Sequence, residues 1–116
     1  MADLVYHITS AEQITRASAM GEYTPSAFAS DGFIHCSYSH QIRQVANVRF
    51  LGRVDLVLLE IDRARLFCTV LDENLEGGKD LYPHVYGPLP MSAVVRILEF
   101  PCSRDGTFEL PRGVGV

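Results

Sequence analysis

The hydrophobic positions of this chain fall into short runs separated by turn residues. The first run, residues 4–9, is rich in β-branched and aromatic side chains and stops at Ser10, which Gln13 follows three positions later. This order predicts a strand that leads into a helix, with Ser10 and Gln13 forming a capping box at the first helical turn. The helix is expected to end near Met20, because Gly21 readily adopts the left-handed conformation of a helix C-cap.

A second strand and helix are predicted after a loop at residues 22–31. Residues 33–37 are apolar and aromatic and predict a short strand, with Ser37 or Ser39 capping the helix that follows. Four apolar positions at helical spacing indicate this helix: Ile42, Val45, Ala46 and Phe50. Gly52 is expected to end it.

The second half of the chain predicts strands. Residues 56–61 are almost continuously apolar, which favours a central strand with both faces covered, and Glu60 within it must be paired or lie at an edge. Two further strands are predicted, at residues 67–71 and 93–100. The glycine-containing segment 74–80 is expected to be flexible. A turn at Asp105–Gly106 predicts a hairpin within a C-terminal extension, residues 101–116.

Helices and strands mix here without regular β-α-β alternation. This predicts an α+β fold with a mixed, mostly antiparallel sheet and two main helices. A chain of 116 residues that is 47% hydrophobic and 21% charged is expected to form a single domain over residues 1–116. Neither the dinucleotide-binding glycine fingerprint nor a P-loop occurs, so Rossmann and P-loop nucleotide sites are disfavoured.

Charge and processing signals restrict the expected partners and compartment. Ten basic and fourteen acidic side chains give a formal charge of −4, which argues against generic nucleic-acid binding and against attraction to an anionic membrane. No apolar run approaches the roughly 20 residues of a membrane span, and the N-terminus does not resemble a signal peptide. The three cysteines lack C-x-x-C spacing, so a reduced chain in the cytoplasm is expected.

Two histidines in the first half of the chain lie in apolar, strand-like runs, where a polar ring is expected to have a structural or functional role. His7 stands two residues before Thr9, and the two-residue period of a strand places His35 on one face with Phe33 and Ser37. Neutral imidazoles beside hydroxyls and rings suit a ligand with ring faces and hydroxyl groups, such as a nucleotide. We therefore predict His35, Thr9, Phe33 and Ser37 as ligand-binding residues.

A third histidine carries the predicted chemistry. His84 shares a strand face with Tyr82 and Tyr86, which we predict as ligand contacts that stack on a base. The expected catalytic set is His84 as general acid or base, His7, and Glu73, a carboxylate that borders the flexible segment leading to His84. The fourth histidine is expected at the surface, in a first helical turn.

Other interpretations of these residues stay open. The histidines could be core residues satisfied by backbone carbonyls, or belong to a non-catalytic module that binds a small ligand or a protein. Three imidazoles with Cys36 could form a tetrahedral zinc site, although no pair has the spacing of a metal motif. Cys36 could also act as a nucleophile with His7 or His84 as its partner.

Three motifs in order resemble a known family. Residues 32–37, together with 6–9 and 83–89, are similar to the bacterial domain of unknown function 952 family, and the similarity extends over about residues 4–100. Known structures of that family resemble the ADP-ribosyltransferase fold. The resemblance therefore implies a split sheet around a cleft that holds NAD in related proteins.

The resemblance also implies roles for individual residues. His7 stands where the histidine-tyrosine-glutamate transferases carry the histidine that bonds the nicotinamide ribose, and His84 stands where they carry the catalytic glutamate. A neutral imidazole can orient a hydroxyl but cannot balance positive charge on the ribose, so conventional transfer requires Glu73 to substitute. We expect a protein that binds NAD or an NAD-derived nucleotide in a cleft lined by histidine and tyrosine, with ADP-ribosyl transfer or hydrolysis as its chemistry.

Overall fold

The computed structural model describes residues 3–75 and 77–115, and all strand pairs in it are antiparallel. The largest sheet has the order β1-β4-β8, with β1 Leu4–Ser10, β4 Leu56–Asp62 and β8 Val94–Glu99. A second sheet pairs β2 Glu22–Tyr23 with β7 Leu89–Pro90. The third has the order β3-β6-β5, with β3 Ile34–His35, β6 Tyr82–Tyr86 and β5 Thr69–Glu73.

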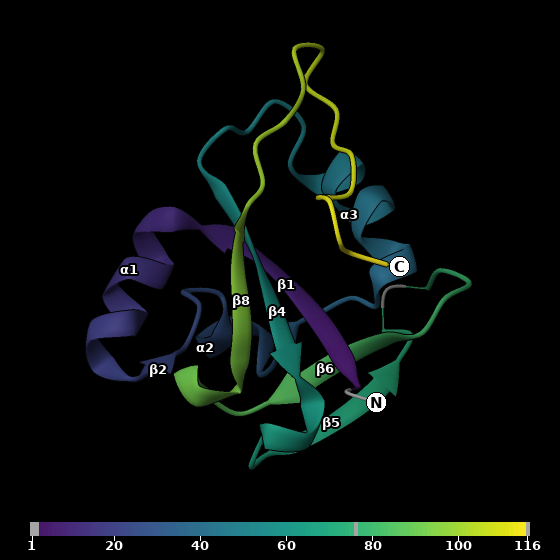
Figure 1. Cartoon of the computed structure of the whole chain (residues 1–116). Helices are drawn as coiled ribbons and strands as arrows, with labels where there is room; N and C mark the ends of the chain where they lie inside the picture. The colour runs from purple at the N-terminus through teal and green to yellow at the C-terminus, as the bar shows by residue number, and fades with distance from the viewer. Residues whose placement is uncertain (1–2, 76, 116) are drawn as a thin grey trace.

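Two main helices and several short turns complete the α+β fold, which confirms the predicted class (Figure 1). The helices are α1 Ala11–Met20, the single turn α2 Phe28–Asp31, and α3 Ile42–Arg49. Three 3-10 turns lie at Ser39–Gln41, Arg63–Arg65 and Met91–Ala93. Within the described residues, no helix has the length and apolar character needed to cross a membrane.

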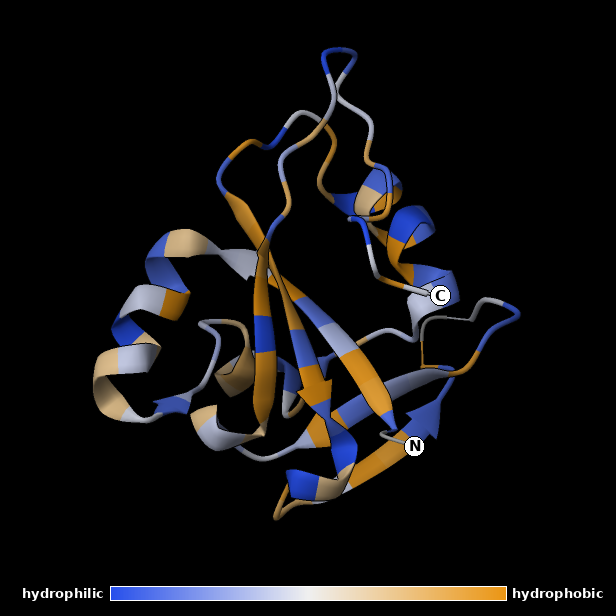
Figure 2. Cartoon of the chain, viewed as in Figure 1, coloured by the Kyte–Doolittle hydropathy of each residue, from blue (hydrophilic) through white to orange (hydrophobic). Residues whose placement is uncertain are grey.

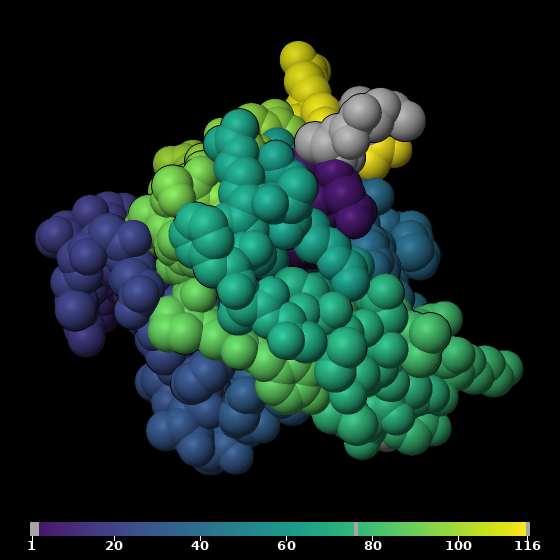
Figure 3. All heavy atoms as spheres, turned by 90° about the horizontal axis from the view of Figure 1, so that it is seen from below, coloured from purple at the N-terminus to yellow at the C-terminus, as the bar shows by residue number. Residues whose placement is uncertain are grey.

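The central strand β4 separates two hydrophobic cores, as its apolar run predicts. Val57, Leu59 and Ile61 pack in one core with residues of α1, β2 and β3, while Leu56 and Leu58 pack in the other with residues of α3. Figure 2 shows apolar residues along the strands of this sheet. Seen from below, the β4–β5 region and β6 cover that end of the molecule (Figure 3).

Glu60 is buried on β4, and it is paired, as its position requires. Arg96 on β8 donates two hydrogen bonds to its carboxylate, at 2.8 and 2.7 Å, and the Tyr6 hydroxyl donates a third at 2.9 Å. These bonds, with that of Arg96 as the main cause, lower the pKa of Glu60 despite its burial. The network joins the three strands of the largest sheet through a charged carboxylate.

The first strand–helix junction follows the prediction with one difference. The Ser10 hydroxyl accepts from the Gln13 N–H at 3.2 Å, and Gly21 (φ 78°) ends α1 by donating to the Ala17 carbonyl. The other half of the predicted capping box, in which the Gln13 side chain bonds back to the start of the helix, is wrong. The Gln13 side-chain oxygen instead accepts from the Ser26 N–H at 3.3 Å, because the loop that folds over the start of α1 brings its own donor.

Element boundaries differ where tertiary pairing overrides local signals. The serine cap predicted for α3 is wrong, since Ser37 is paired in a two-way bridge with Tyr6 and the Gln41 side chain instead accepts from the Tyr38 N–H. This helix ends at Arg49, before Gly52. The strand predicted at 67–71 lies at 69–73, with Phe67 89% exposed. Within the segment predicted to be flexible, residue 76 lies outside the described residues.

The predicted C-terminal hairpin forms only its turn, closed by a bond from the Gly106 N–H to the Ser103 carbonyl. No strand follows it in the described residues up to 115. Phe108 is fully buried, lies 5.0 Å from the Phe100 ring, and its backbone N–H and carbonyl both bond the Asn47 side chain on α3. The segment after the turn runs beside α3 (Figure 1), because burial of Phe108 there is more favourable than pairing of this segment with β8.

Candidate functional site

A cavity of about 490 Å³ lies along the outer side of β1, the edge strand of the largest sheet. Its lining comes from β1, the loop before α2, β3, the end of α3 and β6. Three histidines contribute to it: His7, His35 and His84. The topology therefore gathers on one cavity three imidazoles that are far apart in the sequence.

His7 is held in the wall by hydrogen bonds at both ring nitrogens. Its Nδ1 lies 2.6 Å from the His35 carbonyl, and its Nε2 lies 2.8 Å from the Tyr23 hydroxyl, which is 2.9 Å from the Thr9 hydroxyl. Desolvation lowers the pKa of His7 from 6.5 to about 4, so the ring is neutral at pH 7.

The direction of this hydrogen-bond chain follows from the carbonyl, which can only accept. Nδ1 of His7 therefore carries the proton, and Nε2 has a lone pair that accepts from the Tyr23 hydroxyl. Because Tyr23 has one proton, the Thr9 hydroxyl donates to it in turn. The chain leaves the Thr9 oxygen as a hydrogen-bond acceptor in the cavity wall.

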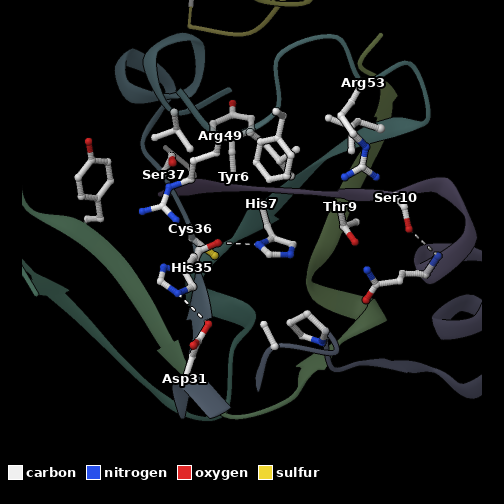
Figure 4. A pocket seen from close by; sticks show the side chains of 18 of the residues that line it. Tyr6, His7, Thr9, Ser10, Asp31, His35, Cys36, Ser37, Arg49 and Arg53 are labelled. Carbon is white, nitrogen blue, oxygen red and sulfur yellow. Dashed lines mark hydrogen bonds and ion pairs between the residues drawn. The ribbon is translucent and has the colours of Figure 1, made fainter. Parts of the chain in front are cut away.

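His35 and Asp31 lie on the same side of β1 as His7 (Figure 4). The His35 Nε2 is 3.1 Å from a carboxylate oxygen of Asp31, and both side chains are partly exposed. Gly32 adopts a left-handed conformation (φ 82°), which turns the chain between α2 and β3 and lets the two side chains meet.

His84 lies opposite His35 in the β3–β6 register and is 2% exposed. Its Nδ1 is 3.1 Å from Oε1 of Glu73, and the Tyr86 hydroxyl donates to the same oxygen. The bond from Tyr86, followed by that from His84, lowers the pKa of Glu73. The Phe33 ring stacks on the imidazole of His84 at 4.1 Å. His84 and Glu73, both predicted as catalytic residues, are thus in direct contact.

Two arginines line the other side of the cavity. Figure 4 shows Arg49 and Arg53 on one side of β1, with His7 and Thr9 on the other. Arg53 forms a bidentate pair with Asp55, at 2.8 and 2.7 Å, in which both side chains are about half exposed. The cavity therefore has a guanidinium side and a histidine side, separated by the edge of β1.

The backbone of β1 supplies a further polar group between these sides. Tyr6 exchanges two backbone bonds of 2.7 Å with Ser37 on the outer side of β1. In an antiparallel ladder the outward groups alternate, so the N–H and C=O of Ile8 point the same way as those of Tyr6. Among the described residues these two groups of Ile8 have no hydrogen-bond partner, and Ile8 lines the cavity.

Comparison with known proteins places the chain in a family. The family model described as protein of unknown function (DUF952) matches residues 8–97. This chain belongs to the DUF952 family. The crystal structure of protein CC0527 from Caulobacter crescentus is 33% identical, with a TM-score of 0.84 over 93% of this chain and 95% of that one. The solution NMR structure of CC0527 gives a TM-score of 0.81 over 92% of each chain at 33% identity. No curated protein matches.

The DUF952 match includes His35, Glu73 and His84 and begins one residue after His7. It establishes the family that the sequence motifs indicate, and the structural neighbours support the small α+β arrangement. Neither the family description nor the neighbours' names mention an ADP-ribosyltransferase-like fold, which stays a prediction.

Most of the predicted ligand contacts of this DUF952 protein line the cavity: Thr9, His35, Ser37 and Tyr82. Phe33 and Tyr86 do not line it: Phe33 stacks on His84, and the Tyr86 hydroxyl donates to Glu73. Glu73 lines an adjoining hollow of about 150 Å³ that shares Tyr82 and His84 with the cavity. His40 is exposed, as predicted, and stacks on Tyr38.

Several lining residues were not predicted, among them Tyr23, Gln13 and Asp31. Tyr23 lies in a two-residue strand without a recognisable local pattern, and Asp31 follows from sequence only through its i, i+4 spacing to His35.

Two alternative chemistries lose support in this structure. Burial raises the pKa of the Cys36 thiol to about 12, so Cys36 is protonated at neutral pH and is not a thiolate nucleophile. Within residues 3–75 and 77–115, no three His, Cys, Asp or Glu side chains group closely enough to hold a metal ion. The described residues therefore contain no candidate zinc site.

Proposed function

We propose that this protein binds NAD or an NAD-derived nucleotide in the cavity along β1. The observation that carries the proposal is the convergence of three histidines, two arginines and the open backbone edge of Ile8 on one cavity of about 490 Å³. This volume lies within the usual range of small-molecule sites, roughly 300–1,000 Å³.

The groups of the cavity complement those of an NAD-type ligand. A carboxamide, such as that of nicotinamide, carries N–H donors beside a carbonyl acceptor, and the C=O and N–H of Ile8 offer the matching pair. The guanidinium groups of Arg49 and Arg53 suit phosphate oxygens. On the opposite side, Thr9 and His35 suit ribose hydroxyls, and so does Ser37, which lies beside Arg49 (Figure 4).

The proposal includes the ADP-ribosyltransferase-like fold, a cytoplasmic location and chemistry at the nicotinamide ribose, either transfer or hydrolysis. Separate antiparallel sheets that meet beside the cavity support it. A second candidate, binding without turnover, is favoured by His7, because the protein itself occupies both of its ring nitrogens. A His84→Ala variant separates the two candidates: a binding module changes only in affinity, whereas an enzyme loses product formation.

An NMR titration with NAD, ADP-ribose and nicotinamide tests the proposal. We expect NAD to shift the amide signals of residues 7–9 and the ring signals of His35, and nicotinamide to shift the Ile8 amide alone among the cavity residues. Loss of one charge-assisted bond is worth about 1.5–3 kcal/mol, so Arg53→Gln should weaken NAD and ADP-ribose binding about tenfold or more but leave nicotinamide binding unchanged.

Arg43→Gln is the matched control, since Arg43 lies on α3, pairs with Glu109 and does not line the cavity. It should bind all three ligands as the unmodified protein does. Absence of shifts at these residues up to millimolar ligand would contradict the proposal.

A further inference from the structure

Glu73 and His84 meet because of the register between two antiparallel strands. On β5 and β6, Glu73 lies opposite Tyr82 and Leu71 lies opposite His84, so the carboxylate reaches the imidazole diagonally on a shared face of the sheet. Phe33 stacks on the His84 ring, and the Tyr86 hydroxyl donates to Oε1 of Glu73. Both partners of the 3.1 Å contact are thus held in place by a neighbouring aromatic residue.

This contact determines which nitrogen of His84 carries the proton. A carboxylate oxygen can only accept, so Nδ1–H donates to Glu73, and in the neutral form of the ring this leaves the lone pair on Nε2. Among the described residues Nε2 has no hydrogen-bond partner, and none of their buried side-chain nitrogen or oxygen atoms is left unpaired. Nε2 is therefore not completely buried, and it belongs to a ring that lines both the cavity and the adjoining hollow.

We propose that Glu73 and His84 act as one unit, in which Nε2 of His84 takes the proton of a hydroxyl nucleophile and Glu73 positions the ring and balances its charge. The proposal rests on the proposed function, because the nucleotide supplies the electrophile. His84 is the catalytic residue, and Glu73 is a positioning residue.

In the step itself, the O–H bond of the nucleophile breaks and its proton moves to Nε2. The oxygen uses the electron pair of that bond to attach to C1′ of the nicotinamide ribose, while the bond from C1′ to the nicotinamide nitrogen breaks. That nitrogen keeps the bonding pair, and nicotinamide leaves as a neutral molecule. The imidazolium then returns its proton to solvent. The nucleophile is water in hydrolysis and an acceptor hydroxyl in transfer.

This assignment answers the electrostatic objection raised by an imidazole in place of a catalytic glutamate. Histidine alone gains a positive charge when it accepts the proton, next to a ribose carbon that is also becoming positive. With the Glu73 carboxylate bonded to Nδ1, the protonated pair carries no net charge. Two of the three catalytic residues expected from the sequence, His84 and Glu73, thus have one joint role rather than alternative ones.

The first experiment measures the tautomer of His84 by ¹⁵N NMR of the imidazole, without ligand. We expect protonation at Nδ1 in the unmodified protein and in Glu73→Gln, whose side-chain oxygen still accepts, and a mixture of tautomers in Glu73→Ala. His40 provides the internal control and should be the same in all three proteins. A tautomer in Glu73→Ala that is unchanged from the unmodified protein would overturn the positioning role.

The second experiment measures nicotinamide release from NAD in ¹⁸O-labelled water. General base catalysis contributes about 10²–10⁴-fold, so His84→Gln should reduce the rate by at least about 100-fold. The rate for Glu73→Gln should lie between those of the unmodified protein and His84→Gln, because this variant keeps the tautomer of His84 but removes the negative charge. Label in the ADP-ribose product identifies water as the nucleophile, and label appearing only when an alcohol acceptor is omitted identifies transfer to that acceptor.

The outcomes separate this inference from the proposed function. If NAD binds in the titration but no nicotinamide is released, or His84→Gln releases it at the unmodified rate, the catalytic pair is wrong and nucleotide binding stands. If NAD does not bind, both the proposed nucleotide binding and the proposed catalytic pair are wrong.

Discussion

Acidification should destabilise this protein through His7. The ring of this β1 residue is buried and neutral, with a pKa of about 4 that results chiefly from desolvation. In the unfolded chain the same ring titrates near 6.5. Between these two pH values the unfolded state binds more protons than the folded state, so folding loses stability as the pH falls from about 6.5 to about 4.

The magnitude follows from the difference between the two pKa values. Each pKa unit corresponds to about 1.4 kcal/mol, so protonation of His7 should remove about 3 kcal/mol from the free energy of unfolding between pH 7 and pH 4. A His7→Gln variant cannot titrate. At pH 7 this variant should be less stable by about 1–2 kcal/mol, because its amide does not reproduce both bonds of the imidazole.

Urea unfolding at several pH values between 7 and 4 measures this effect. The difference in stability between the unmodified protein and His7→Gln should change by about 3 kcal/mol across the range and reverse in sign between about pH 6 and pH 5, below which His7→Gln is the more stable protein. All other ionisable groups are the same in the two proteins, so their contributions cancel in the difference. His40→Gln is the matched control and should follow the unmodified protein at every pH. A difference for His7→Gln that does not depend on pH would refute the reasoning.

Two further predictions concern stability. Tyr6→Phe removes one of the hydrogen bonds to the buried Glu60 carboxylate and should cost about 2 kcal/mol in urea unfolding, with Arg96 still holding Glu60; an unchanged stability would mean that the tyrosine bond contributes nothing. Phe108→Ala should cost about 3–5 kcal/mol, because Phe108 is fully buried against Phe100. Phe67→Ala, at a side chain 89% exposed, should change stability by less than about 0.5 kcal/mol, and equal losses in the two variants would contradict the described packing.

The sequence predicts those parts of the fold in which one local signal dominates. The continuous apolar run of β4 identifies a central strand, and Ser10 and Gly21 mark the two ends of α1. Strand periodicity also places His84 on one face with Tyr86, and both contact Glu73. These features depend on residues close together in the chain, so pattern and propensity are enough to locate them.

The remainder of the site depends on pairings between distant segments. The bond from His7 to Tyr23 needs the two-residue strand β2, which exists only because β7 pairs with it. The orientation of Glu73 toward His84 depends on the β5–β6 register, which lies two residues from the predicted strand position. Arg49 and Arg53 face the cavity because α3 ends beside β1. No local sequence pattern indicates these pairings between distant segments.

The C-terminal segment has a practical consequence for work on related proteins. The family match ends at residue 97, yet the core beneath α3 is completed by Phe100, Phe108 and Val114. A fragment cut to the matched range would expose Ile42 to solvent and would also lose most of β1, which begins at Leu4. For this chain, the smallest unit expected to fold independently is therefore longer at both ends than the segment by which the family is recognised.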